Sequence, residues 1–112
     1  MSSNHCVVEI TDSKKFDFIL SNYQDKLIVV DFTATWCGPC QRIKPCFHEC
    51  SNQYKDKCLC LSVDVDKFPD LTKKYNIEAM PTFLCFLNQK KVHEIVGMDE
   101  QGLRKVFLQY SM

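Results

Sequence analysis

The sequence predicts an α/β fold in three layers, with a central mixed sheet of about five strands flanked by about four helices. Two observations lead to this fold class. Short apolar segments alternate with segments of helical periodicity, and two short segments near the C-terminal end are separated only by a turn. With 112 residues, the chain is expected to form one domain over residues 1–112, large enough to bury a core without disulfide bonds or a structural metal.

The N-terminal part contains two expected strands and one expected helix. Residues 7–10 predict a short strand, and Asp12 with its neighbours can cap the helix that follows. Residues 27–30 are continuously apolar and mostly β-branched, so we expect a central strand that is buried on both faces. The helix between these strands has one apolar face, formed by Phe16, Ile19, Leu20 and Tyr23.

The middle of the chain predicts two more helices around a further strand. Pro45 lies inside the first of these helices, which begins near Cys37, and should bend it. Residues 58–65 predict a buried strand, and Pro69 suits the first turn of a short helix that ends near Tyr75. The longer helix should pack through Ile43, Phe47, Cys50 and Tyr54.

The C-terminal part predicts a hairpin and a last helix. Residues 82–87 and 91–96 should pair antiparallel around a turn at residues 88–90, and Gly97 should end the second strand. Met98 or Asp99 then opens a helix whose apolar face comprises Leu103, Val106, Phe107 and Tyr110. The expected order of elements is β-α-β-α-β-α-β-β-α.

Charge and hydropathy exclude several classes of function. Fourteen basic residues balance fourteen acidic ones, so no net field favours nucleic acid or an anionic membrane. Residues 1–6 lack the charged and apolar regions of a signal peptide, and no apolar run approaches the roughly 20 residues that span a bilayer. We therefore expect a cytoplasmic protein, with the nucleus left open, that is a monomer and binds neither nucleic acid nor membranes.

Two of the eight cysteines, Cys37 and Cys40, stand in a C-x-x-C motif that predicts dithiol chemistry. If a helix begins near Cys37, unpaired backbone N–H groups stabilise its thiolate, so Cys37 is the expected nucleophile and Cys40 the resolving thiol. This chemistry requires the attacking sulfur to be exposed. Gly38 and Pro39 should help to set the redox potential, and Trp36 offers an apolar surface for a peptide.

Asp31 and Pro81 are the other candidate site residues. Asp31 stands at the end of the expected central strand, where burial should raise its pKa and allow it to accept the Cys40 proton, directly or through one water. The alternative is a structural aspartate at a strand end. Pro81 directly precedes a strand, a position that suits a cis bond, but from the residues alone an ordinary trans proline is the preferred interpretation.

Several segments together resemble the thioredoxin family, in particular its animal cytosolic members. They are residues 30–40, 43–48, 63–66 and 80–83 and Gly97, which match the family's motifs in order and spacing over nearly the whole chain. The resemblance implies a thioredoxin fold and the reduction of disulfides in target proteins. It also implies that no cofactor is bound, and that thioredoxin reductase supplies reducing equivalents from NADPH.

The resemblance also assigns roles to individual residues. It makes Cys37 the nucleophile, Cys40 the resolving thiol and Asp31 the group that deprotonates Cys40, while Gly38 and Pro39 tune the potential. Pro81 would be a cis proline that faces the cysteines, and a substrate groove would be lined by Trp36, Met80, Pro81, Gly97 and Met98. One departure is Ser62, which replaces a lysine that bacterial members carry near the buried aspartate. Another is Ala79, which replaces a cysteine of mammalian members.

The remaining cysteines allow other interpretations. A zinc site could use Cys37, Cys40, Cys58 and Cys60, but we expect the last two to point to opposite faces of a strand, so no metal is expected. Cys46 and Cys50, with His48 nearby, could form a regulatory pair, although core packing is the preferred interpretation. Cys85 and one of Cys58 or Cys60 should be buried and inert, whereas Cys6 should be the most reactive of the extra thiols.

Two alternative functions remain open for this fold and motif. One is a redox-independent module that binds partners through the same groove. The other is an oxidase or isomerase, because thiolate stability sets the direction of exchange.

Overall fold

The computed structural model describes residues 6–111, and within this range the predicted elements occur in the predicted order. The elements are β1 Val7–Glu9, α1 Ser13–Asn22, β2 Leu27–Thr33, α2 Gly38–Gln53, β3 Cys58–Asp64, α3 Pro69–Lys74, β4 Thr82–Leu87, β5 Lys90–Val96 and α4 Glu100–Tyr110. Residues 1–5, on which most of the argument against a signal peptide depends, lie outside the described residues. Within residues 6–111, no helix is both long and apolar enough to cross a membrane.

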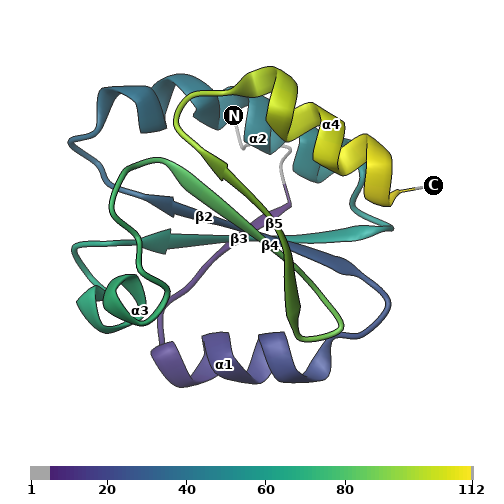
Figure 1. The fold of residues 1–112 in the computed structure, drawn as a ribbon, viewed down its shortest axis with the longest axis horizontal. Helices are drawn as coiled ribbons and strands as arrows, with labels where there is room; N and C mark the ends of the chain where they lie inside the picture. Colours follow the sequence, from purple (N-terminus) through teal and green to yellow (C-terminus); the bar gives the residue numbers. More distant parts are fainter. Residues whose placement is uncertain (1–5, 112) are drawn as a thin grey trace.

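The strands form one mixed sheet in the order β1-β3-β2-β4-β5. β3 runs parallel to β1 and β2, while β4 is antiparallel to both β2 and β5. Helices α2 and α4 cover one face of this sheet, and α1 and α3 lie on the other (Figure 1). The three-layer architecture is therefore confirmed.

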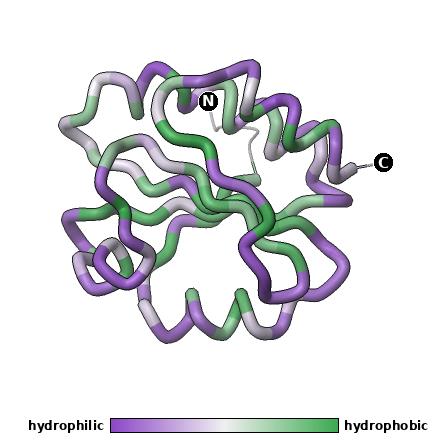
Figure 2. The backbone as a smooth tube through the Cα atoms, viewed as in Figure 1, coloured by the Kyte–Doolittle hydropathy of each residue, from purple (hydrophilic) through white to green (hydrophobic). Residues whose placement is uncertain are grey.

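Strand β2 lies at the centre of the sheet and is buried over its whole length. Its side chains alternate between the two faces, as the pleat requires. Ile28, Val30 and Phe32 pack in the core beneath α1, whereas Leu27 and Val29 pack in the core beneath α2 and α4. Hydrophobic residues accordingly concentrate in the strands between the helical layers (Figure 2).

The ends of three helices are fixed by side chains that cap them. Asp12 accepts a hydrogen bond from the Lys14 N–H at 2.9 Å at the start of α1, and Asp99 accepts one from the Gly102 N–H at 2.9 Å at the start of α4. Cys37 occupies the N-cap position of α2.

Helix α2 continues past Pro45 without interruption. The proline therefore does not end the helix, and the expected bend stays a prediction.

Two expectations about the strands were wrong. Strand β2 continues to Thr33, which pairs with Asp64 of β3, so Asp31 lies inside the strand and not at its end. Cys58 and Cys60 belong to the same core cluster beneath α2 and α4, because residues two apart on a strand point to the same face. The expectation that they face opposite sides was therefore incorrect.

Candidate active site

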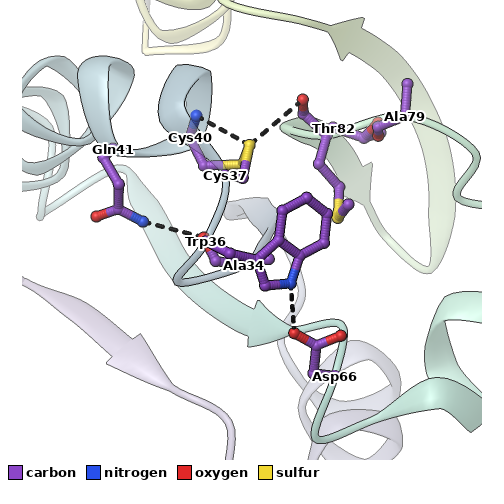
Figure 3. Close-up of a disulfide and its surroundings, with 9 residues drawn as sticks. Ala34, Trp36, Cys37, Cys40, Gln41, Asp66, Ala79 and Thr82 are labelled. Carbon is purple, nitrogen blue, oxygen red and sulfur yellow. Dashed lines mark hydrogen bonds between the residues drawn. A yellow bond between two sulfur atoms is a disulfide. The ribbon is translucent and has the colours of Figure 1, made fainter.

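The two cysteines of the C-x-x-C motif form a disulfide at the start of α2. Their Cα atoms are 5.3 Å apart, and the Cys40 N–H lies 3.2 Å from the Cys37 Sγ (Figure 3). The helix begins at Gly38, and Pro39 fits its first turn because the N–H that proline lacks would have no partner there. The Cys37 sulfur therefore lies at the N-terminal end of the helix, where partial positive charge favours a thiolate.

The disulfide is less exposed than the chemistry led us to expect. Cys37 is 6 % exposed and Cys40 is 1 % exposed, so the expectation of an openly exposed attacking sulfur was wrong for this oxidised state. The Met80 carbonyl oxygen lies 3.7 Å from the Cys37 sulfur and contributes to its cover. Trp36, by contrast, is 66 % exposed directly beside the disulfide (Figure 3).

The loop before β4 brings the other predicted groove residues to this place. The Met80–Pro81 peptide bond is cis, as the family resemblance implied. The Gly97 N–H donates a hydrogen bond of 2.8 Å to the Pro81 carbonyl oxygen, and Gly97 has a φ of 89°, a conformation that favours glycine. Met98 follows it with an exposed side chain. Met80 thus contacts Cys37, and Pro81 is joined to Gly97.

Two polar contacts around the motif involve residues that were not predicted from the sequence. The Trp36 Nε1–H donates a hydrogen bond of 2.7 Å to Asp66, which follows β3 (Figure 3). The Gln41 side-chain amide donates one of 3.0 Å to the Ala34 carbonyl oxygen. These bonds fix the segment that leads into the cysteines. The sequence signal for Asp66 was the pair of acidic residues, Asp64 and Asp66, at and just after the end of β3.

Asp31 is buried beneath α2, and only 3 % of it is exposed. Burial raises the pKa of its carboxyl to about 7, while the positive charge of Lys44 acts in the opposite direction. A buried aspartate with a raised pKa was predicted, but the contribution of Lys44 was not. The only sequence signal was the position of Lys44, one helical turn after Cys40.

A cavity of about 250 Å³ borders Asp31 between α2 and the sheet. Asp31 and Thr33 both line it, and their Oδ1 and Oγ1 atoms have no hydrogen-bond partner among the described residues. A polar cavity of this size has room for water that can satisfy such groups. Its lining residues are Val7, Glu9, Asp31, Thr33, Ala34, Thr35, Gln41, Lys44, Phe47, His48, Ser62 and Asp64.

The other buried thiols belong to the core. All five side chains are at most 4 % exposed, so both Cys58 and Cys60 are buried and not just one of them; the set is Cys46, Cys50, Cys58, Cys60 and Cys85. Burial raises the pKa of Cys50 and Cys85 to about 12, which keeps these thiols protonated and unreactive. Cys6 is exposed. No group of three or more candidate metal ligands is found among residues 6–111.

Two cysteines joined as a disulfide at the N-terminus of a helix, beside an exposed aromatic side chain, are suited to thiol–disulfide exchange with other proteins. The chain is a protein disulfide oxidoreductase. The sequence model described as thioredoxin matches residues 7–109, and the chain belongs to the thioredoxin family.

Individual relatives agree with this assignment. Human thioredoxin is 42% identical over 97 residues, which cover 87% of this chain and 91% of the human protein. A crystal structure of a thioredoxin from Nicotiana alata has a TM-score of 0.91 at 35% identity, over 98% of this chain and 96% of that one. A further structure, from work on thiol resolution in a yeast mitochondrial 1-Cys peroxiredoxin by the glutathione and thioredoxin systems, has a TM-score of 0.85 at 29% identity, with coverage of 96% and 99%.

Proposed function

We propose that this chain is a cytoplasmic, monomeric reductant that transfers electrons from its Cys37–Cys40 dithiol to disulfides in target proteins. The observation that carries the proposal is the disulfide itself, which lies at the N-terminus of α2 against the loop of Met80 and the cis Pro81. The thiols that need to change state are thus held within bonding distance of each other, and a peptide can reach them from the side of Trp36.

In the first step, the Cys37 thiolate attacks one sulfur of the target disulfide. A bond forms between Cys37 Sγ and that sulfur, and the other target sulfur leaves as a thiolate that takes a proton from solvent. The N-terminal end of α2 favours the attacking thiolate. The backbone of Met80 is the proposed pairing site for the extended target chain, because its carbonyl oxygen already faces the Cys37 sulfur.

In the second step, Cys40 attacks the Cys37 sulfur and releases the target as a free thiolate. Cys40 must first lose its proton, and Asp31 is the proposed acceptor. A carboxyl with a pKa of about 7 is near half ionised at neutral pH, which suits a general base. Because Asp31 lines the cavity and its Oδ1 lacks a partner, the proton is proposed to pass through one water molecule.

The groove around the disulfide supports recognition of an unfolded or extended segment. Trp36 and Met98 expose apolar surface, and a backbone hydrogen bond joins Gly97 to Pro81. Gly38 and Pro39 are proposed to tune the potential, since they determine how the helix begins between the two sulfurs. The oxidised protein would be recharged by an NADPH-dependent thioredoxin reductase, with no cofactor bound to this chain.

The test is NADPH oxidation in the presence of thioredoxin reductase and a disulfide-bonded protein, with wild type and Cys40→Ser. Wild type should turn over steadily. The variant should stop after one attack and accumulate a mixed disulfide through Cys37 that mass spectrometry detects. Absence of NADPH consumption by the wild type would contradict recycling by this reductase, while failure of the pre-reduced protein to reduce the target would contradict the reductase function.

A second candidate function is partner binding that does not depend on redox chemistry. The exposed surface of Trp36 beside the disulfide favours it, because such apolar surface mediates protein contacts. The double variant Cys37→Ser/Cys40→Ser separates the two functions. A pure binding module keeps its partner after this change, whereas a reductase loses all turnover.

A further inference from the structure

A groove between α2 and α4 lies away from the disulfide and takes no part in the chemistry described above. The two helices contact each other on one face of the sheet (Figure 1). The groove between them, called here the α2–α4 groove, has a volume of about 430 Å³, larger than the cavity beside Asp31. Its first lining residue, Cys50, follows Cys40 by ten positions in α2, which places it about 15 Å further along the helix.

One wall of the α2–α4 groove is a single stripe of side chains on α4. The stripe consists of Gln101, Arg104, Lys105 and Leu108, which recur at the i, i+3, i+4, i+7 spacing of one helix face. Two helical turns span about 10 Å, which matches an extended chain of about eight carbons. Leu108 is 56 % exposed and leaves apolar surface open at one end of the stripe.

The base of the groove comes from α2 and is neutral and apolar. Cys50 is 1 % exposed, and burial raises the pKa of its thiol to about 12, so the thiol carries no charge. Tyr54 forms the next part of the lining. Its ring stacks on Phe107 with 5.6 Å between the ring centroids and an interplanar angle of 20°, so the core holds it in place.

The charge of the groove is positive and is not balanced within it. Arg104 and Lys105 both line it, whereas no acidic side chain among residues 6–111 does. Arg104 is paired at 2.7 Å with Glu49, which lies outside the lining, but Lys105 forms none of the ion pairs found among the described residues. Gln53 and Gln101 add side-chain N–H donors. Because the chain as a whole has no net charge, this excess is local.

We propose that the α2–α4 groove binds an amphiphilic carboxylate, whose unbranched apolar chain lies over Cys50 and Tyr54 while its anionic head is held by Lys105. The volume lies within the range of small-molecule sites. Two helical turns offer much less surface than the roughly 800 Å² per partner that a stable protein interface buries, which favours a small ligand over a protein. The proposal is independent of the reductase function.

The direct test is a titration of the intact protein with sodium decanoate below its micelle concentration, followed by backbone amide NMR. Saturable shifts should appear at residues 50–54 and 101–108, with a dissociation constant of roughly 0.1–1 mM for a ligand of this size. Octanoate should bind about four- to fifteen-fold more weakly, because it buries two fewer methylene groups. Decanol and decyltrimethylammonium keep the apolar chain without the anion and should each bind at least about ten-fold more weakly.

Substitutions at exposed positions separate the charge from the apolar wall without disturbing the core. Lys105→Glu should weaken decanoate binding about ten-fold or more, and Lys105→Arg should retain it. Leu108→Gln should weaken it about three-fold, because part of the apolar wall is lost. Lys15→Met serves as the matched control, since it removes an exposed lysine from α1, on the opposite face of the sheet, and should change nothing.

Three results would overturn the proposal. The first is the absence of saturable shifts at the groove residues, or equal affinity in Lys105→Glu and wild type. The second is binding of decanol or decyltrimethylammonium as tight as that of decanoate, which would mean apolar adsorption without recognition of an anion. The third is that the groove signals respond to protein concentration, or to an acidic amphipathic helical peptide, but not to decanoate. The groove would then be a protein interface.

Discussion

Asp31 combines two properties that oppose each other, a carboxyl group and nearly complete burial. The central strand determines the burial, and desolvation then favours the protonated form, which raises the pKa to about 7 from a normal value of 3.8. A residue kept for stability alone would be apolar at this depth. A buried carboxyl with this pKa is what the proposed role of Asp31, acceptor of the Cys40 proton, requires.

The stability of the protein should depend on pH through Asp31. The unfolded chain ionises near pH 3.8, while the folded protein stays protonated until about pH 7, so stability falls between these values and is constant above them. Three pH units at about 1.36 kcal/mol each give a loss of about 4 kcal/mol. Asp31→Asn should therefore raise the free energy of unfolding at pH 8 by up to about 4 kcal/mol, measured by urea titration.

The same variant should slow the resolving step, because an amide cannot accept the Cys40 proton. Asp56→Asn, an exposed substitution, serves as the control and should change neither the stability profile nor the rate. A stability difference between Asp31→Asn and wild type that stays constant from pH 4 to pH 8 would contradict the raised pKa.

At the scale of single elements, the N-terminal ends of α2 and α4 lie next to the residues of the candidate site. Helix α2 begins at the redox motif, so one N-cap position, Cys37, both starts the helix and holds the sulfur that is proposed to attack. Helix α4 begins directly after the groove residues Gly97 and Met98. The caps therefore link local backbone structure to the geometry of the site.

The cap of α4 gives a prediction at this scale. Asp99→Ala removes the side chain that accepts the Gly102 N–H bond and should lower the free energy of unfolding by about 1 kcal/mol, as N-cap losses do. Asp99→Asn retains an acceptor and should cost much less. Thermal or urea unfolding of the three proteins checks this. Equal losses in both variants would show that the negative charge, and not the hydrogen bond, stabilises the helix.

For the whole molecule, the redox state and the stability should be linked. The disulfide closes a short loop between residues that are three apart in sequence, and the chain-entropy relation gives about 2 kcal/mol for such a loop. The oxidised protein should thus resist urea more than the reduced protein by about this amount. Unfolding with and without a dithiol reductant measures the difference.

The double variant Cys37→Ser/Cys40→Ser is the matched control for this comparison. It cannot close the loop, so its unfolding should not respond to the reductant. A reduced wild type that is as stable as the oxidised form would mean that the folded state carries a strain that cancels the gain in entropy.

Most of the fold was predictable because each element has its own periodic signal. The continuous apolar run of β2 indicated a central strand, and the spacing of Leu103, Val106 and Phe107 indicated the buried face of α4. The end of β2 was misjudged, since Asp31 and Thr33 are polar and their strand conformation depends on pairing with β3. Residues two apart on a strand point to the same face, so the sequence did predict a shared face for Cys58 and Cys60. The expectation of opposite faces was a mistake in applying this geometry.

The sequence by itself determined the order of elements, the C-x-x-C pair and a buried aspartate near it, because these depend on local periodicity and spacing. The family resemblance placed Met80 and Pro81 near the cysteines, but only the tertiary structure gives the contacts themselves. Met80 reaches the Cys37 sulfur across 43 residues, and Lys44 shares a cavity with Asp31, because the chain crosses the sheet in the order β1-β3-β2-β4-β5. Such contacts arise from how layers pack, and no local pattern in the sequence encodes them.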